Sequence, residues 1–317
     1  PGSGIRSPSH RHEFAVWETG MVRAFQPLLL LIPLIGACCL LLPRTPADDE
    51  TGEISEASTQ APRTMGVASC AASACHGGTR PSERTEYTTW VQHDRHAKAY
   101  LALFDKPAQQ IAKRLNIAQP HQDNRCLVCH ATAPDGPRDT RFAIEDGVSC
   151  EACHGPAERW LASHSKPDGK TKKTHHDKYE RLGMKMTTDV AVRASVCVTC
   201  HVGSTAGEVN HDLIAAGHPP LVFELDAYTA NMPPHWKETS DKPAAFGAQA
   251  WAGRQAVVLK QSLDLLAKRA TTGPWPEFAA FECSACHHEL GKENWRQDRV
   301  SGGRRPGGPV WTSPQWM

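Results

Sequence analysis

The most constraining feature of this sequence is a close cysteine pair followed at once by a histidine, because the combination occurs five times. The chain has 12 cysteines, of which Cys38 and Cys39 lie in an N-terminal apolar segment. The other ten form the pairs Cys70/Cys75, Cys126/Cys129, Cys150/Cys153, Cys197/Cys200 and Cys283/Cys286, followed by His76, His130, His154, His201 and His287. With 17 histidines in 317 residues, five such coincidences arise by chance roughly once in a million trials.

Three kinds of site use closely spaced cysteines. Ten cysteines in one exported chain first suggest five disulfides, but their close pairing argues otherwise. Zinc sites combine CxxC pairs in twos, which leaves one pair over and gives the adjacent histidines no role. CxxCH is the attachment signature of c-type haem, in which the thiols add to the porphyrin vinyl groups and the histidine binds the iron from the proximal side. Four of the five pairs have this spacing, so the sequence predicts covalently bound haem.

The first pair has a wider spacing, Cys70-Ala-Ala-Ser-Ala-Cys75-His76. CxxxxCH is a variant of the attachment motif in multihaem cytochromes, where the loop between the thiols bulges away from the porphyrin edge. Such a bulge requires small residues, which Ala71 to Ala74 supply, and Gly77-Gly78 allow the chain to turn away after the histidine. We therefore predict five haems, with a structural disulfide at the first pair as the alternative.

Each iron has a second axial position, and the sequence offers more histidines than these positions need. Two axial imidazoles give a low-spin haem suited to electron transfer, because little reorganises when the iron changes oxidation state. His93 and His96 lie in a stretch of helical periodicity, residues 86–104, and the alternative for either is a solvated helix face. His211 and His218 lie about 10 Å apart along a short helix ended by Gly217. The further candidates are His164, His235 and His288, together with His175 and His176 in a charged run whose lysines can also dock an acidic redox partner.

An apolar segment near the N-terminus predicts export. Residues 27–43 are apolar, Arg23 precedes them and polar residues follow, as in an export signal that starts at Met21. Residues 35–38 resemble a bacterial lipobox, which would lipidate Cys38 and tether the protein to a membrane. Cleavage near residues 45–47 and an uncleaved anchor helix are the alternatives. All three place the folded part in the periplasm or another extracytoplasmic space, with or without a membrane anchor.

The composition fits a core built largely from cofactor. Only 40% of the residues are hydrophobic, and the mean hydropathy is -0.46. The net charge of +1 gives no reason to expect nucleic acid as a partner. No alternating β-pattern stands out. We predict a mainly α fold of the multihaem cytochrome c type, with short helices and long loops packed around covalently bound haems and little or no β-sheet.

The chain divides into five segments. Residues 1–43 are an export signal or membrane anchor, and residues 44–65 are a flexible linker. Residues 66–205 form a four-haem domain, and residues 206–298 form a histidine-rich helical extension with the fifth haem. Residues 299–317 are a disordered tail. Residues 107–118 form a candidate helix. Residues 251–270 have the best helical pattern, ended by Gly273-Pro274, and their apolar face (Val258, Leu259, Leu263 and Leu266) is predicted to cover the fifth haem.

Several motifs between about residues 70 and 201 occur together. They are "HAKAY" at His96, "RCLVCH" at Cys126, "DGVSCEACHGP" at Asp146, the following His164 and "VCVTCH" at Cys197, and "GVSCEACHGP" is the most specific. In this combination the stretch resembles the tetrahaem cytochrome c-554 family of ammonia oxidisers and its multihaem relatives. The resemblance implies a mainly helical fold with long loops, haems stacked in close pairs, and electron transfer between periplasmic proteins.

The resemblance also carries ligand assignments. It implies that His96 is the distal ligand of the haem at Cys150/Cys153 and that His164 is the distal ligand of the haem at Cys70/Cys75. This chain departs from the family in its wider first motif and its fifth motif. The second haem of the family lacks a distal side chain, whereas residues 206–298 here bring further histidines near the end of the chain.

Two functions are compatible with these features. The first is an electron carrier between redox partners, which are other redox proteins or quinol-linked membrane cytochromes. The alternative is a multihaem oxidoreductase that acts on a small nitrogen or sulfur oxide at a five-coordinate haem. Pentahaem nitrite reductases mark their catalytic haem with CxxCK, and the sequence has no such motif, which favours the carrier. The residues predicted to bind iron are the five proximal histidines and His96, His164, His211 and His218.

Overall fold

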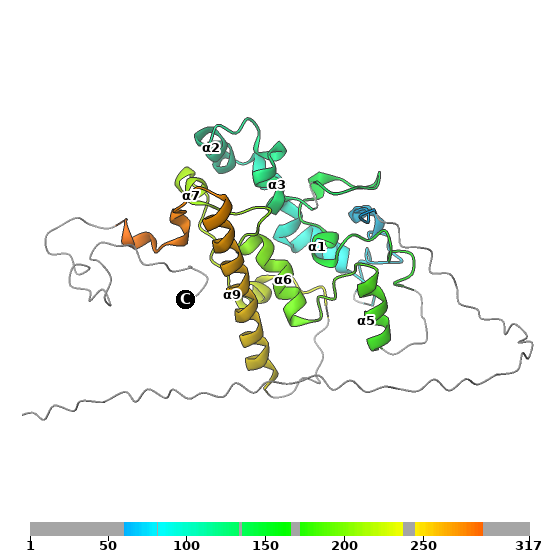
Figure 1. Ribbon diagram of the computed structural model, residues 1–317. Coiled ribbons are helices and arrows are strands. Elements are labelled where there is room, and N and C mark those ends of the chain that lie inside the picture. The colour runs from blue at the N-terminus through cyan, green and yellow to red at the C-terminus, as the bar shows by residue number, and fades with distance from the viewer. Residues whose placement is uncertain (1–59, 81, 133–134, 166–171, 237–244, 288–317) are drawn as a thin grey trace, which may run out of the picture. The chain divides into compact units, whose positions relative to one another are not determined.

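Short helices joined by long loops make up the computed structural model, which describes residues 60–80, 82–132, 135–165, 172–236 and 245–287 (Figure 1). All of these residues belong to one unit of the chain, residues 57–317. Thr64 and Arg138 form an isolated parallel bridge, and no β-sheet is formed within these ranges. The prediction of a mainly α fold with little or no β-sheet is confirmed.

The described ranges contain nine α-helices. They are α1 (Glu86–His93), α2 (Lys106–Arg114), α3 (Asn124–His130), α4 (Cys150–His154), α5 (Lys172–Arg181), α6 (Val190–His201), α7 (His211–Ala216), α8 (Leu225–Asn231) and α9 (Phe246–Thr272). Short 3-10 helices lie between them: η1 (Val67–Ser69), η2 (Arg95–Lys98), η3 (Leu101–Phe104), η4 (Pro120–Gln122), η5 (Ile144–Asp146), η6 (Phe278–Ala280) and η7 (Cys283–Ala285). The longest helix, α9, has 27 residues and ends at Gly273 as predicted.

Three of the cysteine–histidine motifs form the last turn of an α-helix. α3 ends at His130, α4 at His154 and α6 at His201. α3 and α6 begin at aspartate caps, because the Asp123 carboxylate accepts a hydrogen bond from the Arg125 amide and the Asp189 carboxylate accepts one from the Ala191 amide. The local sequence thus places each of these histidines at a helix C-terminus.

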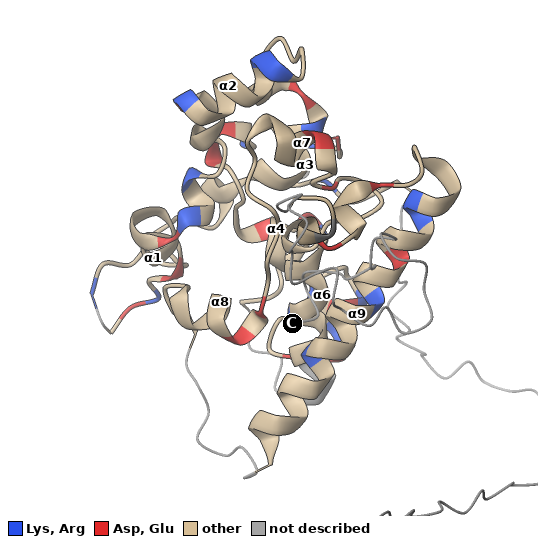
Figure 2. Ribbon diagram, turned by 90° about the vertical axis from the view of Figure 1, so that its left-hand side faces the viewer, with Lys and Arg blue, Asp and Glu red and all other residues tan. Residues whose placement is uncertain are grey.

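The long helix α9 packs along α6, and the two run side by side in Figures 1 and 2. Val258 of α9 is buried in one cluster with Ala194, Val198 and Val202 on and just after α6, and Leu265 is buried close to Gly203. The predicted apolar face of α9 is therefore wrong in part, since Leu263 is 47% exposed and the buried face follows Val258, Ser262 and Leu265. The helix covers α6 and thus the fourth motif, because the apolar side of α6 is the surface it contacts.

Buried apolar side chains form three separate clusters. Besides the α6–α9 cluster, one joins Met65, Ala157, Trp160 and Tyr179, and another joins Tyr100, Leu103, Leu127 and Ala131. Each cluster lies beside cysteine–histidine motifs: Leu127 is inside the second, Ala157 follows the third and Val198 is inside the fourth. This small, divided core fits a fold in which cofactors fill much of the interior.

Two predicted helices differ from those in the structure. The helical pattern of residues 86–104 is broken after α1, because Asp94 has an extended backbone and its carboxylate caps the His96 amide at 2.9 Å. The remainder forms η2 and η3. The helix predicted over residues 107–118 is α2, which ends at Arg114, and Asn116 has a positive φ of 52° that an α-helix does not contain.

The end of the predicted flexible linker is part of the packed structure. Thr64 and Met65 are buried, and the amides of Met65 and Gly66 donate to the Glu151 carboxylate, each at 2.8 Å. Arg63, which lies on the same N-terminal segment as Met65, donates to the Glu158 carboxylate. The predicted linker, residues 44–65, therefore reaches too far, because Arg63 to Met65 have partners beside the third motif.

Some predictions fall on residues outside the described ranges. These include the export signal or anchor at residues 1–43 and the tail at residues 299–317. No helix within the described ranges is both long and apolar enough to span a membrane. Figure 2 shows Lys and Arg interspersed with Asp and Glu along the described helices.

Candidate haem-binding sites

The helical motifs place their three functional side chains on one side of a helix. In α3, α4 and α6 the cysteines are three residues apart and the histidine is four residues from the first, which is the spacing of neighbours on a helix surface. All ten cysteines in the described ranges are free thiols, so the disulfide alternative is not formed, at Cys70/Cys75 included. No group of three or more His, Cys, Asp and Glu side chains in those ranges converges as a zinc site requires.

The first motif, residues 70–76, is a tight loop. The Cys75 amide donates to the Ala72 carbonyl at 2.8 Å, and the His76 amide donates to the Cys70 carbonyl at 3.2 Å. The next residue must be glycine, because a Cβ at Gly77 would lie only 1.9 Å from the Ala71 carbonyl oxygen. The small residues predicted for the wider spacing therefore allow the loop to fold on itself and bring His76 back next to Cys70.

The fifth motif differs from what the sequence predicts. Cys283 and Cys286 were expected to hold a haem covered by α9, but both side chains are exposed in the structure, whereas the thiols of α3, α4 and α6 are half-buried. Two local features explain the difference. The motif forms only the single 3-10 turn η7, in which the amides of Cys286 and His287 donate to the Cys283 carbonyl at 3.2 and 2.8 Å, and the buried face of α9 lies against α6. The predicted cover by α9 is therefore wrong, and haem attachment at Cys283 and Cys286 stays a prediction.

Three pairs of histidine rings lie at the separation expected across one iron. An iron–imidazole bond is about 2 Å long and the ring centre lies about 1 Å beyond the bound nitrogen, so two axial imidazoles have ring centres about 6 Å apart. The ring centres of His76 and His164 are 6.1 Å apart, those of His96 and His201 are 6.1 Å apart, and those of His211 and His287 are 6.3 Å apart. Each pair joins one predicted proximal histidine to a histidine from another part of the chain.

The hydrogen bonds of the histidine rings use Nδ1 and leave Nε2 available to bind a metal. Nδ1 of His130 lies 2.8 Å from the Ala99 carbonyl, Nδ1 of His164 lies 2.8 Å from the Leu161 carbonyl and Nδ1 of His218 lies 2.8 Å from the Pro219 carbonyl. A carbonyl only accepts, so Nδ1 carries the hydrogen in all three rings and Nε2 keeps its lone pair for a metal. His76 and His96 direct Nδ1 to carboxylates in the same way, at Glu86 and Asp94. Such outer partners are typical of histidines that bind metals.

The structure places His96 beside His201, whereas the family resemblance assigns it to the haem at Cys150/Cys153. Asp94 accepts from both the amide and Nδ1 of His96 at 2.9 Å, which fixes the ring after the break in the helix. The hydrogen bond to Asp94 raises the pKa of His96. The ring of His201 is turned 86° to that of His96. His93 is exposed, which agrees with the alternative that its side chain lies on a solvated helix face.

Two further histidines lie near the remaining proximal rings. Burial lowers the pKa of His130, and nearby His218 acts in the same direction. Burial lowers the pKa of His154 to about 4, and His235 adds to this effect. Neutral imidazole is the form that binds a metal, so both buried rings are in that form at neutral pH. His235 precedes Trp236, whose ring lies 5.7 Å from the Arg193 guanidinium on α6.

The family comparison agrees with this geometry over part of the chain. The model of the family described as cytochrome c554 and c-prime matches residues 69–155, which contain the first three motifs. This segment is c554-like. No curated protein and no solved structure matches the chain significantly. The match supports a multihaem c-type cytochrome that transfers electrons and holds its haem covalently.

Within and beyond the c554-like segment, thiols of different motifs meet in a definite order. A hydrogen bond between Cys70 and Cys150 lowers the pKa of Cys70 and raises that of Cys150. A hydrogen bond from Cys129 likewise lowers the pKa of Cys200 to about 6. Burial raises the pKa of Cys153 to about 12, and Cys197 adds to this. The motifs are therefore neighbours in the order first, third, fourth, second.

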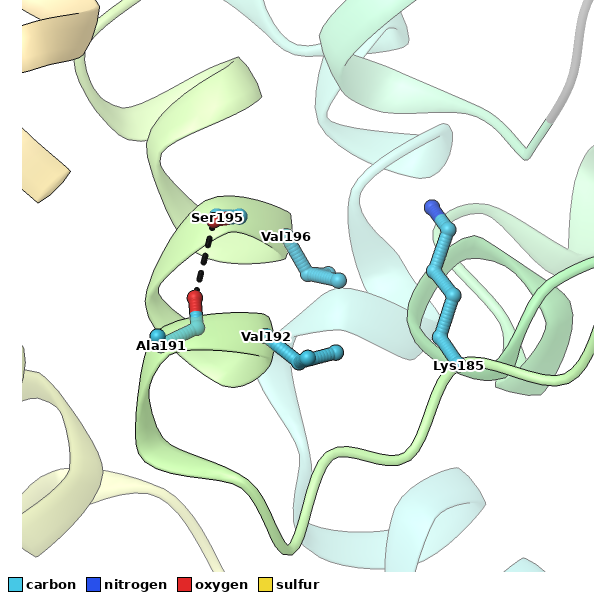
Figure 3. Close-up of a pocket in the computed structure, with 5 residues that line it drawn as sticks. All are labelled: Lys185, Ala191, Val192, Ser195 and Val196. Atoms are coloured by element: carbon cyan, nitrogen blue, oxygen red, sulfur yellow. Dashed lines mark hydrogen bonds between the residues drawn. The ribbon is translucent and has the colours of Figure 1, made fainter. Parts of the chain in front are cut away.

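An open apolar pocket lies beside the c554-like segment, next to the third motif (Figure 3). Its volume is about 360 Å³, and it is lined by Lys185, Ala191, Val192, Ser195 and Val196. Val192 and Val196 point from α6 towards Lys185, whose amide donates to the His154 carbonyl at 2.9 Å. The Ser195 hydroxyl is turned away to the Ala191 carbonyl. A mostly apolar wall beside His154 suits a porphyrin, and together with the paired imidazoles and free thiols it indicates that these residues fit haem.

Sequence reasoning missed several residues of these sites. His235 was one of several open candidates, and nothing in its surrounding sequence connects it to His154. The outer partners Glu86, Asp94 and Ala99 had no sequence signal beyond their proximity to α1 and η2. Among the other histidine candidates, His288 and the side chains of His175 and His176 lie outside the described residues.

Proposed function

We propose that this chain is an exported c-type cytochrome with five haems that carries electrons between redox partners. The observation that carries the proposal is the set of three histidine pairs with ring centres 6.1 to 6.3 Å apart, each containing a proximal histidine. His130 and His154 each have a further histidine nearby. Haem held at these positions would supply one-electron redox chemistry, with these histidines as the residues that would hold its iron.

The residues of the chain then act as a rigid frame for electron transfer. The carbonyl and carboxylate partners of Nδ1 hold the imidazoles in one tautomer and orientation, so the ligand set stays the same in both oxidation states. The oxidoreductase alternative needs an open axial position. The histidine partners of His76, His201 and His287 argue against such a position at these three sites and favour the carrier.

Export and partners belong to the same proposal. The apolar segment at residues 27–43 supports export to the periplasm or another extracytoplasmic space, with lipidated Cys38 or an anchor helix as the membrane tether where one is present. The partners proposed are other redox proteins or quinol-linked membrane cytochromes. The mixed surface charge agrees with contacts to proteins rather than to nucleic acid.

The haem content tests the proposal directly. The full chain is produced in a bacterial host that attaches c-type haem, and haem is counted by intact mass and by the pyridine haemochrome spectrum. We expect five haems per chain and five electrons taken up in a reductive titration. Changing both Cys70 and Cys75 to Ser should lower the count to four, which tests the wider motif, and the same change at Cys283 and Cys286 tests the exposed fifth motif. A chain that carries zinc or disulfides in place of haem would refute the proposal.

A further inference from the structure

The helix α7 lies between two candidate ligands, His211 at its first position and His218 just after its C-terminal Gly217. The helix spans His211–Ala216 and is capped by Asn210, whose side-chain oxygen accepts from the Leu213 amide at 3.0 Å. Gly217 ends it in the left-handed conformation with φ of 113°, and His218 follows directly. One short helix therefore fixes the positions of both His211 and His218.

Residues 203–208, which precede α7, contact both α9 and α3. Gln261 of α9 donates to the Gly203 carbonyl at 2.6 Å, and Arg269 of α9 donates to the Glu208 carboxylate at 2.5 Å. Gly207 lies so close to Val128 of α3 that a Cβ would come within 2.2 Å of its side chain. Val128 is inside the second motif, two residues before His130. The extension is thus fixed against the helix that carries the second proximal histidine.

The C-terminal end of α7 is held on α2. Arg114 donates to the Ala216 carbonyl at 2.8 Å, and a Cβ on Gly217 would lie 3.2 Å from the same guanidinium. α2 in turn contacts η3 and η4, which pack on α3, and Figure 2 shows α2, α3 and α7 at the same end of the described part. These contacts bring His218 to the side of the fold where His130 ends α3.

The N-terminal end of α7 is held at the fifth motif. The His211 amide donates to Glu277 at 2.8 Å, and the same carboxylate oxygen accepts from the Ala279 amide at 2.9 Å. The ring of His211 lies 5.7 Å from Phe278 and 6.3 Å from His287. His211 therefore already has a partner, and it is the proximal histidine of the fifth motif.

We propose that His218 of the C-terminal extension is the distal ligand at His130, so that α7 closes the second site while its other end serves the fifth. The inference rests on the proposed function, since it assumes haem at Cys126/Cys129. Both rings bind a backbone carbonyl through Nδ1 and so have only Nε2 left for iron. The family resemblance implies a second haem without a distal side chain. In this chain His218 of the extension would fill that open position. The second and fifth haems would then be neighbours, and the spatial order of the haems would be first, third, fourth, second, fifth.

His121 is the competing ligand for the same site, and its surroundings argue against it. It lies in η4 close to α3, and its Nδ1 is buried without a hydrogen-bond partner. Its ring stacks on Phe104 at 4.4 Å with 24° between the planes, which holds it within an aromatic group that also includes Tyr100. It lacks the carbonyl partner that fixes Nδ1 in His130 and His218.

The test is the spin state and carbon monoxide binding of the haem-loaded full chain. We expect the unaltered protein to show only low-spin ferric signals in electron paramagnetic resonance and to bind no carbon monoxide when reduced. His218→Ala should convert one haem per chain to the high-spin form and bind one equivalent of carbon monoxide, and added imidazole should reverse the change. His211→Ala should convert one haem as well, and the double variant two. His121→Ala is the matched control, expected to leave all haems low-spin.

A second variant keeps the test decisive if His218→Ala fails to mature. His218→Met should keep the site six-coordinate and raise the reduction potential of one haem, because methionine favours ferrous iron more than histidine does. Carbon monoxide binding by the unaltered protein, or a high-spin haem caused by His121→Ala in place of His218→Ala, would overturn the inference. Peptide mass analysis that finds no haem on Cys126/Cys129 would refute the proposed function at this site, so the two failures are distinguishable.

Discussion

Replacing Glu151 by glutamine should weaken the attachment of the N-terminal segment at the third motif. Glu151 is only 5% exposed, and its carboxylate accepts three backbone amide hydrogen bonds, from Met65 at 2.8 Å, Gly66 at 2.8 Å and Ala157 at 2.7 Å. Both oxygens are used, since Met65 and Ala157 donate to one and Gly66 donates to the other. In Glu151→Gln one oxygen becomes an amide NH₂, which would face the Gly66 N–H as a second donor.

The magnitude follows from these contacts. A hydrogen bond to a charged group contributes about 1.5 to 3 kcal/mol, and a buried N–H left without a partner costs about 1 to 3 kcal/mol. One of the three bonds is lost outright and the other two lose their charge, so we expect Glu151→Gln to lower the free energy of unfolding by about 3 kcal/mol. Glu158→Gln is the matched control, because Glu158 binds Arg63 on the same segment while 32% exposed. It should cost much less than Glu151→Gln, because solvent screens an exposed ion pair.

The assay is guanidinium unfolding of the haem-loaded, oxidised protein, combined with hydrogen exchange of residues 60–66. Glu151→Gln should shift the unfolding midpoint and speed the exchange of the Met65 and Gly66 amides, with the haem count unchanged. If Glu151→Gln and Glu158→Gln had the same effect within about 0.5 kcal/mol, the buried carboxylate would not be the group that holds the segment, and the reasoning would be refuted.

Four further outcomes are expected. Leu265→Ala should lower the free energy of unfolding by about 2 to 5 kcal/mol in denaturant titrations, because it leaves a cavity where α9 buries this side chain near Gly203, whereas Leu263→Ala on the 47% exposed side should change it by less than about 0.5 kcal/mol. Gly217→Ala should cost about 1 to 2 kcal/mol in the same titrations, since φ there is 113° and the Cβ would press on Arg114; an unchanged midpoint would contradict this. His164→Ala should give one high-spin haem in the electron paramagnetic resonance spectrum, and the exposed His93→Ala none, because only His164 faces His76. Acidified organic solvent should extract no haem from the denatured chain, as measured by absorbance of the organic phase, since thioether bonds survive unfolding; free haem in that phase would argue against attachment at the cysteine pairs.

The haem-attachment residues could be predicted from the sequence because their chemistry is local. Two thiols and an imidazole must sit within one turn of chain, so Cys150, Cys153 and His154 can be recognised without knowledge of the rest of the fold. The wider first motif could be predicted for the same reason, from the small residues between Cys70 and Cys75. The segments that cover a motif come from distant parts of the chain. For this reason the exposure of Cys283 and Cys286 could not be predicted from their local sequence.

The distal partners could not be predicted in this way, because they depend on packing between distant segments. His96 lies beside His201 after a turn set by the Asp94 cap, a break that helical periodicity does not reveal. The buried face of α9 was misjudged because the helix has apolar residues on two sides, and contact with α6 decides which side is covered. The ligand role proposed for His218 depends on Arg114 and Val128, which lie about a hundred residues away along the chain.

The positions of the motifs at helix ends have a consequence for the energetics of electron flow. The C-terminus of an α-helix carries a partial negative charge from its unpaired carbonyl groups, and such a charge stabilises ferric over ferrous iron. α3, α4 and α6 each end at their proximal histidine, whereas the fifth motif begins with the single 3-10 turn η7. The helix dipoles should therefore lower the potentials of the second, third and fourth haems relative to the fifth. The first motif is a loop and also lacks an α-helix end, so on this term alone the first and fifth haems would hold electrons more strongly than the second, third and fourth.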